Sequence, residues 1–451
     1  MRAIQLKIDP FEFISILKWD CVKELGEHGV LRIRGLVAED HRLSYHRLAM
    51  SETWVCGSAI DEDDEEIVLF QGVLTNVSIH SEHELHTMEI EVMTGSFLLD
   101  QARHIRTFQD SSLSYESLLK TCLEPENGWA IIRGQNNPLI GRFFAQYKET
   151  NWSFIKRLAS GLGIPILPEF KTKGKRLFMG LNDQGKKAEI IANNYTVDTT
   201  HNSSQVGEVY QVTLREIHEL GAFVSFENQI LIVGKVESKL QGAELWHTYT
   251  LFNSVSASHL AFNYPKLSGV SLRASVVNVQ RDRVQIKVHQ DENNQNSGHR
   301  WFDYATVYST PEGQGFYALP DEGDEVRLIF SENNELSAYV ASSVHLSTEG
   351  GRHNPDHKSW KNKQGVEILM TPDELLLTLP DRSFIQLSEA EGIKINSDKA
   401  IQIGSDQQIR INSKDATISL SATDQVSIEQ GSSRINMNDA IDISGGKINM
   451  N

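Results

Sequence analysis

The last quarter of the chain carries a short apolar repeat. From residue 377 onward, two apolar residues separated by one polar residue return about every eight residues, with closer spacing near the end. Residues two apart point to the same side of a β-strand, so each repeat provides one short strand with one apolar face, followed by a polar turn. Such a segment cannot build an ordinary globular core and predicts a stacked β-rod. The pairs are Leu377/Leu379, Ile385/Leu387, Ile393/Ile395, Ile401/Ile403, Ile409/Ile411, Ile418/Leu420, Val426/Ile428, Ile435/Met437, Ile441/Ile443 and Ile448/Met450.

A rod of this kind buries its apolar face only by stacking one repeat on the next. Each fully buried Ile or Leu contributes roughly 1.5–3 kcal/mol, so the set can stabilise a stiff structure. One chain could coil with three repeats per turn, or three chains could each supply one face of a shared prism, and the spacing fits both. No aromatic residue follows Phe384, which favours a thin, regular interior.

The net charge of the chain limits the classes of partner that it can bind. Its 451 residues, enough for two to four domains, carry a net charge of −17 without any Lys/Arg run, which argues against nucleic acid as a partner. The N-terminal stretch MRAIQLKIDP lacks the features of a secretory signal, and no apolar run is long enough to span a bilayer. We therefore expect synthesis in the cytoplasm and export, if any, by other components.

No cofactor or metal is expected. The cysteines Cys21, Cys56 and Cys122 match no zinc spacing and read as reduced core thiols. The acidic run 61–66 is interpreted as a solvated loop rather than a Ca²⁺ site. His353 and His357 have the helical spacing of a zinc pair, but Gly350, Gly351 and Pro355 argue against a helix there.

Catalytic motifs are also missing from the sequence. It contains no G-x-S-x-G nucleophile elbow, no H-E-x-x-H motif and no Walker loop. We therefore expect a protein that is not an enzyme.

Ahead of the repeat, the sequence predicts two blocks of strands separated by a helical segment. The first block has strands at 13–16, 30–34, 67–73 and 85–92, with a turn at 25–29. The second block has strands at 195–197, 209–214, 222–226 and 230–236, with a hairpin turn at Asn228-Gln229. Helices are predicted over 111–122, capped by Ser111 or Ser112, and over 150–162, where Trp152, Ile155, Leu158 and Leu162 recur at helical spacing.

A third block of short strands follows. Its strands are predicted at 270–279, 283–288, 304–308, 325–330 and 338–344. Five strands in this length suit a small barrel of the oligosaccharide/oligonucleotide-binding (OB) type, although the acidic stretch 321–325 argues against nucleic-acid binding. A polar connector then leads into the rod, which begins with Val366, Ile368 and Leu375 as a first irregular strand pair.

Two stretches of this chain resemble one protein family. Residues 146–159, QYKETNWSFIKRLA, resemble the signature Q-Y-x-E-T/S-x-x-x-F-x-x-R-L of the hub of valine-glycine-repeat (VgrG) spike proteins and phage late-control protein D. Residues 315–330, GFYALPDEGDEVRLIF, resemble the P-x-x-G-D-E-V-x-V-x-F segment in the barrel of the same spikes. The terminal repeat is similar to their β-helix, and the order of hub, barrel and rod is the same.

The resemblance implies a mainly β fold: two hub β-barrels with a small helical segment, an OB-type barrel, and a C-terminal intertwined triple-stranded β-helix. It places a tube-docking hub at 1–255, with barrels at about 1–100 and 185–255 and the helical segment at about 101–184. An OB-fold neck follows at 256–350, then a connector at 351–365 and the spike at 366–451. It also selects the three-chain prism that the spacing left open.

The resemblance also implies a function and partners. The chain is expected to form a homotrimeric spike that caps the hexameric inner tube of a contractile injection system, which could be phage tail-like, extracellular or type VI-like. Baseplate proteins would surround it, and a PAAR-type tip protein or an effector would bind its C-terminal end. Sheath contraction would drive the spike through the target envelope, so the membrane would be contacted only on injection.

The resemblance assigns structural residues and no catalytic ones. The hub signature comprises Gln146, Tyr147, Glu149, Phe154, Arg157 and Leu158, and the OB-fold signature comprises Pro320, Gly323, Asp324, Val326 and Phe330. The core of the trimeric β-helix is expected to comprise Ile385, Leu387, Ile393, Ile395, Ile401, Ile403, Ile409, Ile411, Ile418, Leu420, Val426, Ile428, Ile435 and Met437.

The chain lacks two domains that some members of this family carry, and this narrows the function that we expect. The connector leaves no room for the lysozyme that some relatives insert before the rod, and no effector follows the last repeat. We therefore expect a minimal puncturing or carrier spike, with any toxin on a separate chain. Two other functions are kept as alternatives: a β-helix polysaccharide-degrading enzyme, and a tail-fibre-type adhesin that binds a surface glycan.

Overall fold

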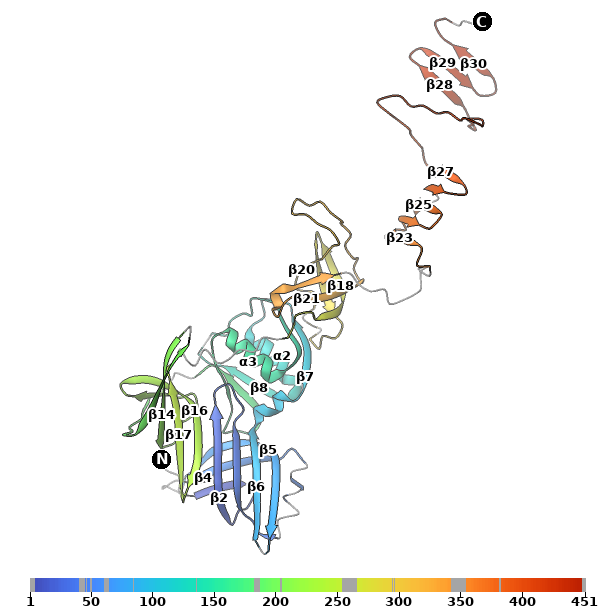
Figure 1. Ribbon diagram of the computed structural model, residues 1–451. Helices are drawn as coiled ribbons and strands as arrows, with labels where there is room; N and C mark the ends of the chain where they lie inside the picture. Colours follow the sequence, from blue (N-terminus) through green and yellow to red (C-terminus); the bar gives the residue numbers. More distant parts are fainter. Residues whose placement is uncertain are drawn as a thin grey trace. The chain divides into compact units, whose positions relative to one another are not determined.

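The computed structural model divides the chain into two compact units, Met1–Val344 and His345–Asn451, which are described separately (Figure 1). It describes residues 5–39, 45, 47–48, 51–60, 65–83, 85–134, 136–181, 187–202, 205–253, 266–293, 295, 297–341, 354–380 and 383–447. Several sequence predictions concern residues outside these ranges. They are most of the acidic run 61–66, the start of the predicted neck, the end of the predicted strand 338–344, the stretch with Gly350, Gly351 and His353, and the repeat pair Ile448/Met450.

The first six strands of the N-terminal unit pair in the order β1-β4-β5-β6-β3-β2, every pair antiparallel. Three of the predicted strands in this block, 30–34, 67–73 and 85–92, are present. The predicted strand 13–16 is wrong in extent, because the strand starts at Ser15 and continues to Glu24, carrying Trp19 and Cys21 into the core. The strands are β1 (Gln5–Asp9), β2 (Ser15–Glu24), β3 (Val30–Leu36), β4 (Trp54–Ile60), β5 (Glu66–Glu82) and β6 (Leu85–Thr94).

A second group of strands forms the later part of the same unit. The turn between β15 and β16 consists of Glu227 and Asn228, both with positive φ (48° and 60°), the backbone signature of a type I′ hairpin turn. The predicted turn at Asn228-Gln229 is therefore wrong by one residue. The strands are β12 (Ala188–Glu189), β13 (Tyr195–Asn202), β14 (Gln205–Leu214), β15 (Phe223–Phe226), β16 (Gln229–Gln241) and β17 (Glu244–Phe252).

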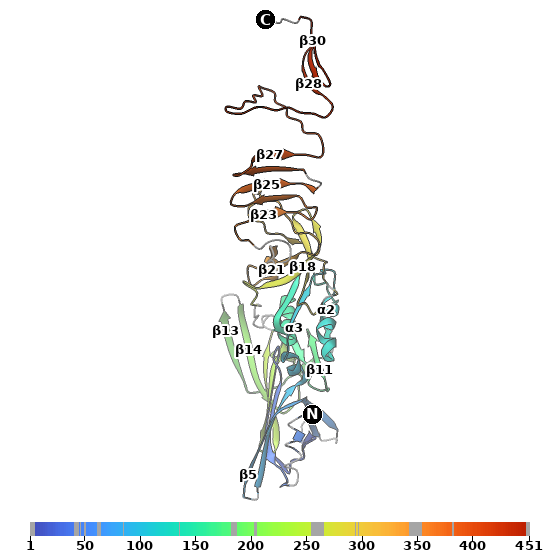
Figure 2. The ribbon, with the colours of Figure 1, turned by 90° about the vertical axis from the view of Figure 1, so that its right-hand side faces the viewer.

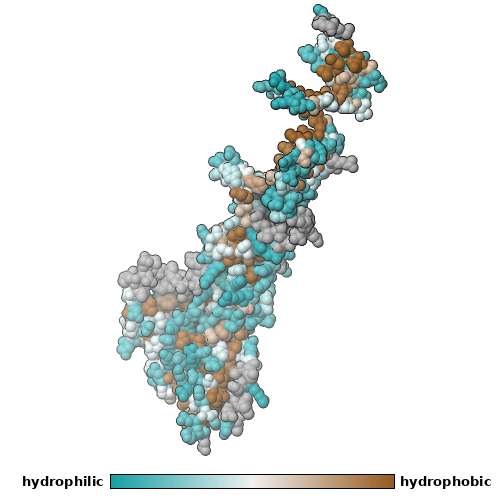
Figure 3. Space-filling model, turned by 45° about the vertical axis from the view of Figure 1, so that its right-hand side comes forward, coloured by the Kyte–Doolittle hydropathy of each residue, from teal (hydrophilic) through white to brown (hydrophobic). Residues whose placement is uncertain are grey.

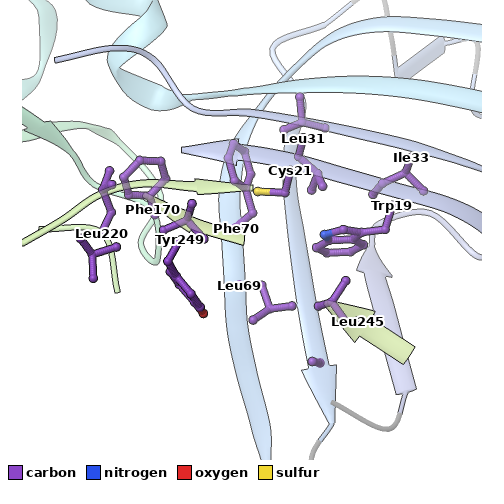
Figure 4. Close-up of a cluster of buried hydrophobic side chains, with 14 of the residues drawn as sticks. Trp19, Cys21, Leu31, Ile33, Leu69, Phe70, Phe170, Leu220, Leu245 and Tyr249 are labelled. Carbon is purple, nitrogen blue, oxygen red and sulfur yellow. The ribbon is translucent and has the colours of Figure 1, made fainter. Parts of the chain in front are cut away.

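One strand pair joins the two groups into a single sheet of twelve strands. Strand β2 pairs with β16 in antiparallel register, from Glu24 opposite Lys235 to Asp20 opposite Lys239. One continuous apolar core runs under both groups and includes Trp19, Phe70 and Tyr249. Figure 4 shows these side chains converging from strands of both groups. The two strand groups are thus one hydrogen-bonded and co-packed structure.

Two helices lie between the strand groups in the chain: α2 (Tyr115–Leu123) and α3 (Asn151–Gly161). Ser114 caps α2 by accepting a hydrogen bond from the Ser117 N–H, so the predicted cap at Ser111 or Ser112 is wrong. Thr150 caps α3 in the same way. Their apolar faces form a separate core with residues of five neighbouring strands and of the 3₁₀ helix η2 (Gly95–Asp100). The strands are β7 (Arg103–Phe108), β8 (Gly128–Ile132), β9 (Phe144–Thr150), β10 (Ile166–Pro168) and β11 (Lys175–Met179), and a short 3₁₀ helix η3 (Glu124–Glu126) follows α2.

The third block is a five-stranded antiparallel sheet in the order β20-β19-β18-β21-β22. The predicted strand 304–308 is wrong: the chain forms only a two-residue strand just before it, and Tyr304 makes a single bridge to Val340. The other four predicted strands are present. The elements are β18 (Ser271–Gln280), β19 (Arg283–Val288), β20 (Phe302–Asp303), β21 (Glu325–Phe330), η5 (Glu335–Ser337) and β22 (Ala338–Ala341).

The C-terminal unit contains two antiparallel meanders (Figure 2). Its first strand lies inside the expected connector and pairs with β24. No strand forms over 397–425, where the repeat predicts three; in the single chain these segments have no neighbouring strand to pair with. The strands are β23 (Lys358–Lys361), β24 (Glu367–Met370), β25 (Glu374–Thr378), β26 (Phe384–Ser388) and β27 (Gly392–Asn396), then β28 (Val426–Gln430), β29 (Ser433–Met437) and β30 (Ile441–Ser444).

Candidate functional site

The hub signature residue Gln146 lies at the centre of a buried polar network. Its side-chain oxygen accepts a hydrogen bond from Arg106 Nη1 at 3.0 Å, and its nitrogen donates to the Glu149 carbonyl oxygen at 3.0 Å. Asn151 accepts from the same Arg106 nitrogen at 2.7 Å and from Gln146 at 3.1 Å. Because every buried donor in this set has an acceptor, the network fixes β7, β9 and the start of α3 against one another.

Arg157, a second signature residue, links helix α3 to the five-stranded sheet. Its guanidinium donates to both carboxylate oxygens of Glu149, at 3.3 and 3.0 Å, and pairs with Glu335 of η5. Burial opposes its charge, yet the two carboxylates outweigh burial and raise the pKa of Arg157. This is a buried, hydrogen-bonded ion triad between two parts of the unit that are far apart in sequence.

The remaining signature residues pack around this triad. The Phe154 ring stacks on Phe108 with centroids 5.8 Å apart, and the Arg157 guanidinium lies 5.0 Å from the Phe154 centroid. Leu158 is fully buried, and the half-buried Tyr147 packs against the core of the five-stranded sheet. The structure therefore brings the six hub signature residues together as packing and hydrogen-bonding groups.

A second link between the hub and the five-stranded sheet was missed in the sequence. Residues 291–293 lie beside β7: Asp291 accepts from the Thr107 N–H at 3.0 Å and from its hydroxyl, and Glu292 accepts from the Ile105 N–H at 3.1 Å. Glu292 also contacts His104 Nδ1 at 2.8 Å. Burial raises the pKa of Asp291 despite the hydrogen bonds from Thr107. No local signal marks these carboxylates, because their partners lie 184 to 188 residues away in the chain.

The OB-fold signature forms the turn that enters β21. Gly323 has a φ of 88° and donates its N–H to the Val276 carbonyl oxygen of β18 at 2.9 Å, and the Asp324 carbonyl oxygen accepts from the Val276 N–H at 2.9 Å. The Asp324 carboxylate accepts from the Asp321 N–H at 2.8 Å. Pro320 is half-buried, and Val326 and Phe330 are fully buried in the core of the sheet. These five residues shape the sheet and present no reactive group.

The expected β-helix core residues are uncovered in the single chain. In the first meander, Ile385 lies opposite Ile395 and Leu387 opposite Ile393, so the apolar residues form rows across the strands. Twelve of the fourteen expose between 37% (Ile435) and 72% (Ile393, Ile403) of their surface, and Val426 and Met437 are half-buried. Figure 3 shows hydrophobic atoms gathered on the C-terminal unit. An apolar surface of this extent marks an interaction site.

One arrangement in the hub is reminiscent of a catalytic triad in its composition. His28 Nδ1 lies 2.8 Å from Ser96 Oγ, and His28 Nε2 lies 3.6 Å from Asp100. Ser96 is completely buried and also contacts the Thr94 hydroxyl at 3.0 Å. A nucleophile needs access to its substrate, and the Ser96 hydroxyl has none, so the three residues act as a packing cluster.

In the described part of the chain, no group of three or more His, Cys, Asp and Glu side chains is placed to hold a metal ion. Of the two histidines whose spacing could suit zinc, His357 is exposed and His353 lies outside the described residues. No helix in the described ranges has the length and apolar character needed to cross a membrane.

No family model and no curated protein matches the chain in sequence, but solved structures match its fold. The E. coli c3393 protein, described as a type VI secretion component similar to the T4 bacteriophage tail proteins gp27 and gp5, aligns with a TM-score of 0.52 at 15% identity, covering 74% of this chain and 99% of that one. A chain of the half-lidded Francisella PdpA–VgrG complex aligns with a TM-score of 0.55 at 10% identity, covering 88% of each chain. The lidded form gives 0.53 at 10% identity, covering 84% and 76%.

These alignments span most of the chain and agree with the two short stretches of sequence resemblance. The structure is mainly β, with a twelve-stranded hub sheet, a five-stranded sheet and stacked terminal strands. The neighbours are structural proteins of tails and secretion systems rather than enzymes. The chain therefore has the fold of the VgrG and phage gp27–gp5 hub-and-spike proteins.

Proposed function

We propose that this protein is a homotrimeric spike that caps the inner tube of a contractile injection system and punctures the target envelope. The fold supports a structural role in a tail or secretion spike. The finer statement rests on one observation, the rows of exposed Ile and Leu along the C-terminal unit. Three chains, each contributing one apolar face, would bury these rows in a shared prism.

The proposed mechanism is mechanical. A prism with an Ile/Leu interior and polar turns outside resists bending, because any bend would expose apolar surface to water. The two buried links, Arg157 with Glu335 and Thr107 with Asp291, would transmit axial load between the hub and the five-stranded sheet. The rod would carry that load to the target.

The proposed partners follow from the same assignment. The hub would dock on a hexameric inner tube protein among baseplate proteins, and the tip would carry a PAAR-type protein or an effector. One neighbour in fold is a complex of VgrG with PdpA, which supports assembly with other components of such a system. The protein would be made in the cytoplasm and assembled into the particle, contacting a membrane only on injection.

A catalytic role is the competing proposal, either for the rod as a polysaccharide-degrading β-helix or for the hub. The rod lacks aromatic side chains after Phe384 for stacking on sugars, and Ser96 of the hub cluster is sealed from solvent. An adhesin would need a receptor-binding surface. The apolar rows instead favour burial against copies of the same chain.

The decisive experiment is the molar mass of the purified protein by size-exclusion chromatography with light scattering, without denaturant. The expected mass is three times the 50.8 kDa of one chain. A monomer at micromolar concentration would exclude the shared prism and direct attention to a single-chain β-helix, and with it to assays on polysaccharides and peptidoglycan.

A further inference from the structure

A cavity of about 470 Å³ opens in the hub, and none of the hub signature residues lines it. Strands β2 and β5, the end of β8, the segment 167–171, and residues 217–220 all contribute to its wall. Cavities of about 300–1,000 Å³ are the usual size of small-molecule sites. None of the functions proposed above uses this cavity.

The wall of the cavity is mostly apolar. Leu69, Phe170 and Leu220 are buried side chains from three separate segments, and Figure 4 shows them together with Phe70, whose ring centroid lies 6.1 Å from that of Phe170. Phe178 lines the same space. A ligand body of aromatic or aliphatic carbon would be well matched to this wall.

Two cations, Lys23 and Arg133, face this apolar wall, and the carboxylates Glu169 and Glu219 line the same cavity without forming a salt bridge to either of them. Lys23 Nζ donates to the Leu69 carbonyl oxygen at 2.6 Å and lies 5.1 Å from the Phe170 centroid. The Arg133 guanidinium lies 3.3 Å from the Phe178 centroid. In the part of the chain that the structure describes, neither side chain forms an ion pair, whereas the exposed Lys171 at the same cavity pairs with Glu219. Burial lowers the pKa of both Lys23 and Arg133.

The cavity lining holds three cations, Lys23, Arg133 and Lys171, and two carboxylates, Glu169 and Glu219, so an anionic ligand would offset the remaining half-buried positive charge. The ammonium of Lys23 keeps donors beyond the one used by Leu69, and guanidinium groups bind carboxylates through paired hydrogen bonds. Glu169 and Glu219, which also line the cavity, would repel an acidic protein surface. These charges favour a single small anion over a docked acidic protein.

We infer that this cavity binds a small organic acid: one carboxylate held by Lys23 and Arg133, attached to an aromatic or aliphatic body that contacts Phe170 and Phe178. The inference goes beyond the proposed spike function and does not rest on it. A bound acid of this kind would link the first strand group to the segment 217–220 of the second.

The test is a ¹⁹F NMR titration of the full-length protein with 4-(trifluoromethyl)benzoate, and with 4-(trifluoromethyl)benzamide as the neutral analogue of nearly the same shape. Each charged hydrogen bond that is lost should weaken binding about tenfold or more. We therefore expect the benzoate to bind at least about tenfold more tightly than the benzamide. Lys23→Met and Arg133→Gln each remove one of the two cations and should each reduce that preference by about tenfold, whereas Lys120→Gln, at an exposed lysine outside the cavity lining, should leave it unchanged.

A further variant separates loss of the site from loss of the fold. Ile67→Trp keeps both cations but fills the cavity from its half-buried position on β5, so it should abolish binding of both probes while the tryptophan fluorescence unfolding transition is retained. Equal affinity for the benzoate and the benzamide would overturn the inference, as would benzoate binding that survives both Lys23→Met and Ile67→Trp, or no binding at millimolar probe.

Discussion

The same strand pattern has opposite outcomes in the two units of this molecule. In β6 of the N-terminal unit, Met88, Ile90 and Val92 alternate with exposed or half-buried residues and are themselves fully buried. In β27 of the C-terminal unit, Ile393 and Ile395 alternate with polar residues in the same way, yet Ile393 is 72% exposed. The alternation defines the apolar face of a strand in both cases, but it does not supply the layer that covers the face.

The difference lies in what packs against each sheet. The hub sheet has twelve strands from two distant parts of the chain and covers its own core. The terminal meanders have five and three short strands without a second layer, and an apolar sheet face needs another layer to be stable in water. The N-terminal unit is therefore expected to be stable as a single chain, and the C-terminal unit only within an assembly.

The largest effect is expected from Ile403→Asp, which tests whether the exposed rows become buried. In a trimer it would place three carboxylates around one axis, each costing several kcal/mol to bury without a partner. The variant should lose the trimeric mass in light scattering while the hub remains folded. Gln402→Asp, on the neighbouring polar position, is the matched control and should remain trimeric. A heat-stable Ile403→Asp trimer would show that the rows are not an interior.

A smaller effect is expected from Arg157→Met, which tests the stability of the N-terminal unit, whose apolar core is already covered. Removing the arginine leaves Glu149 and Glu335 buried without their cation, and breaking a buried pair in this way typically costs about 3–5 kcal/mol. The denaturation midpoint of the hub, followed by tryptophan fluorescence, should fall accordingly. Lys156→Met on the same helix removes only an exposed pair with Glu27 and should cost about 0–1 kcal/mol. Equal effects of the two variants would rule out the ion triad as a stabilising link.

The link through Glu292 should respond to acid. Burial alone would raise the pKa of Glu292, but hydrogen bonds from His104 and the Ile105 N–H outweigh it and lower the pKa overall. A lowered folded-state pKa contributes stability above the unfolded value of about 4.3 and loses it as the pH falls through the folded value.

Glu292→Gln should therefore be less stable than the unsubstituted protein at pH 7, by at most about 1 kcal/mol because the side chain is partly exposed. The difference should shrink below pH 4.3 and vanish in stronger acid. Urea titrations of both proteins from pH 7 to pH 3 would measure it. A difference that is constant over this range would mean that the carboxylate charge is not involved.

The only gain in stability is expected from Glu227→Gly. Glu227 has a φ of 48° in the β15–β16 turn, a conformation that costs a non-glycine residue about 1–2 kcal/mol. Glycine should recover about 1 kcal/mol, seen as a higher denaturation midpoint of the hub. Asn228→Gly is the control and should gain less, because asparagine tolerates the left-handed region. No gain at Glu227 would contradict the turn geometry.

Much of the fold could be predicted from local patterns. Helix α3 follows from the spacing of Trp152, Ile155 and Leu158, and most strands follow from alternation. The helix cap and the hairpin turn were misplaced by one to three residues, and larger errors arose where the signal depended on a distant partner. The polar residues of β2 become a strand because β3 and β16 pair with them on either side, and 304–308 fails to form a strand although its composition suits one.

The contacts that link the hub to the five-stranded sheet could be predicted least. The hub signature identified Arg157 and Glu149. Glu335 lies 178 residues from its partner Arg157, and nothing in its local sequence distinguishes it from a glutamate exposed on the surface. Asp291 and Glu292 are hidden for the same reason. Burial of the terminal repeat between chains stays a prediction, because a single chain has nothing to cover Ile403 or Ile411.

The pairing of β2 with β16 also sets a time for folding. Glu24 finds its partner only at Lys235, so a ribosome adding about 5–20 residues per second needs about 10–40 seconds between these two positions. During that interval one edge of β2 has unpaired backbone groups, which is the state in which strands associate wrongly with other chains. The hub sheet is thus completed only after more than half of the chain has been made, and conditions that slow translation should increase the amount of insoluble protein before they alter the stability of the finished fold.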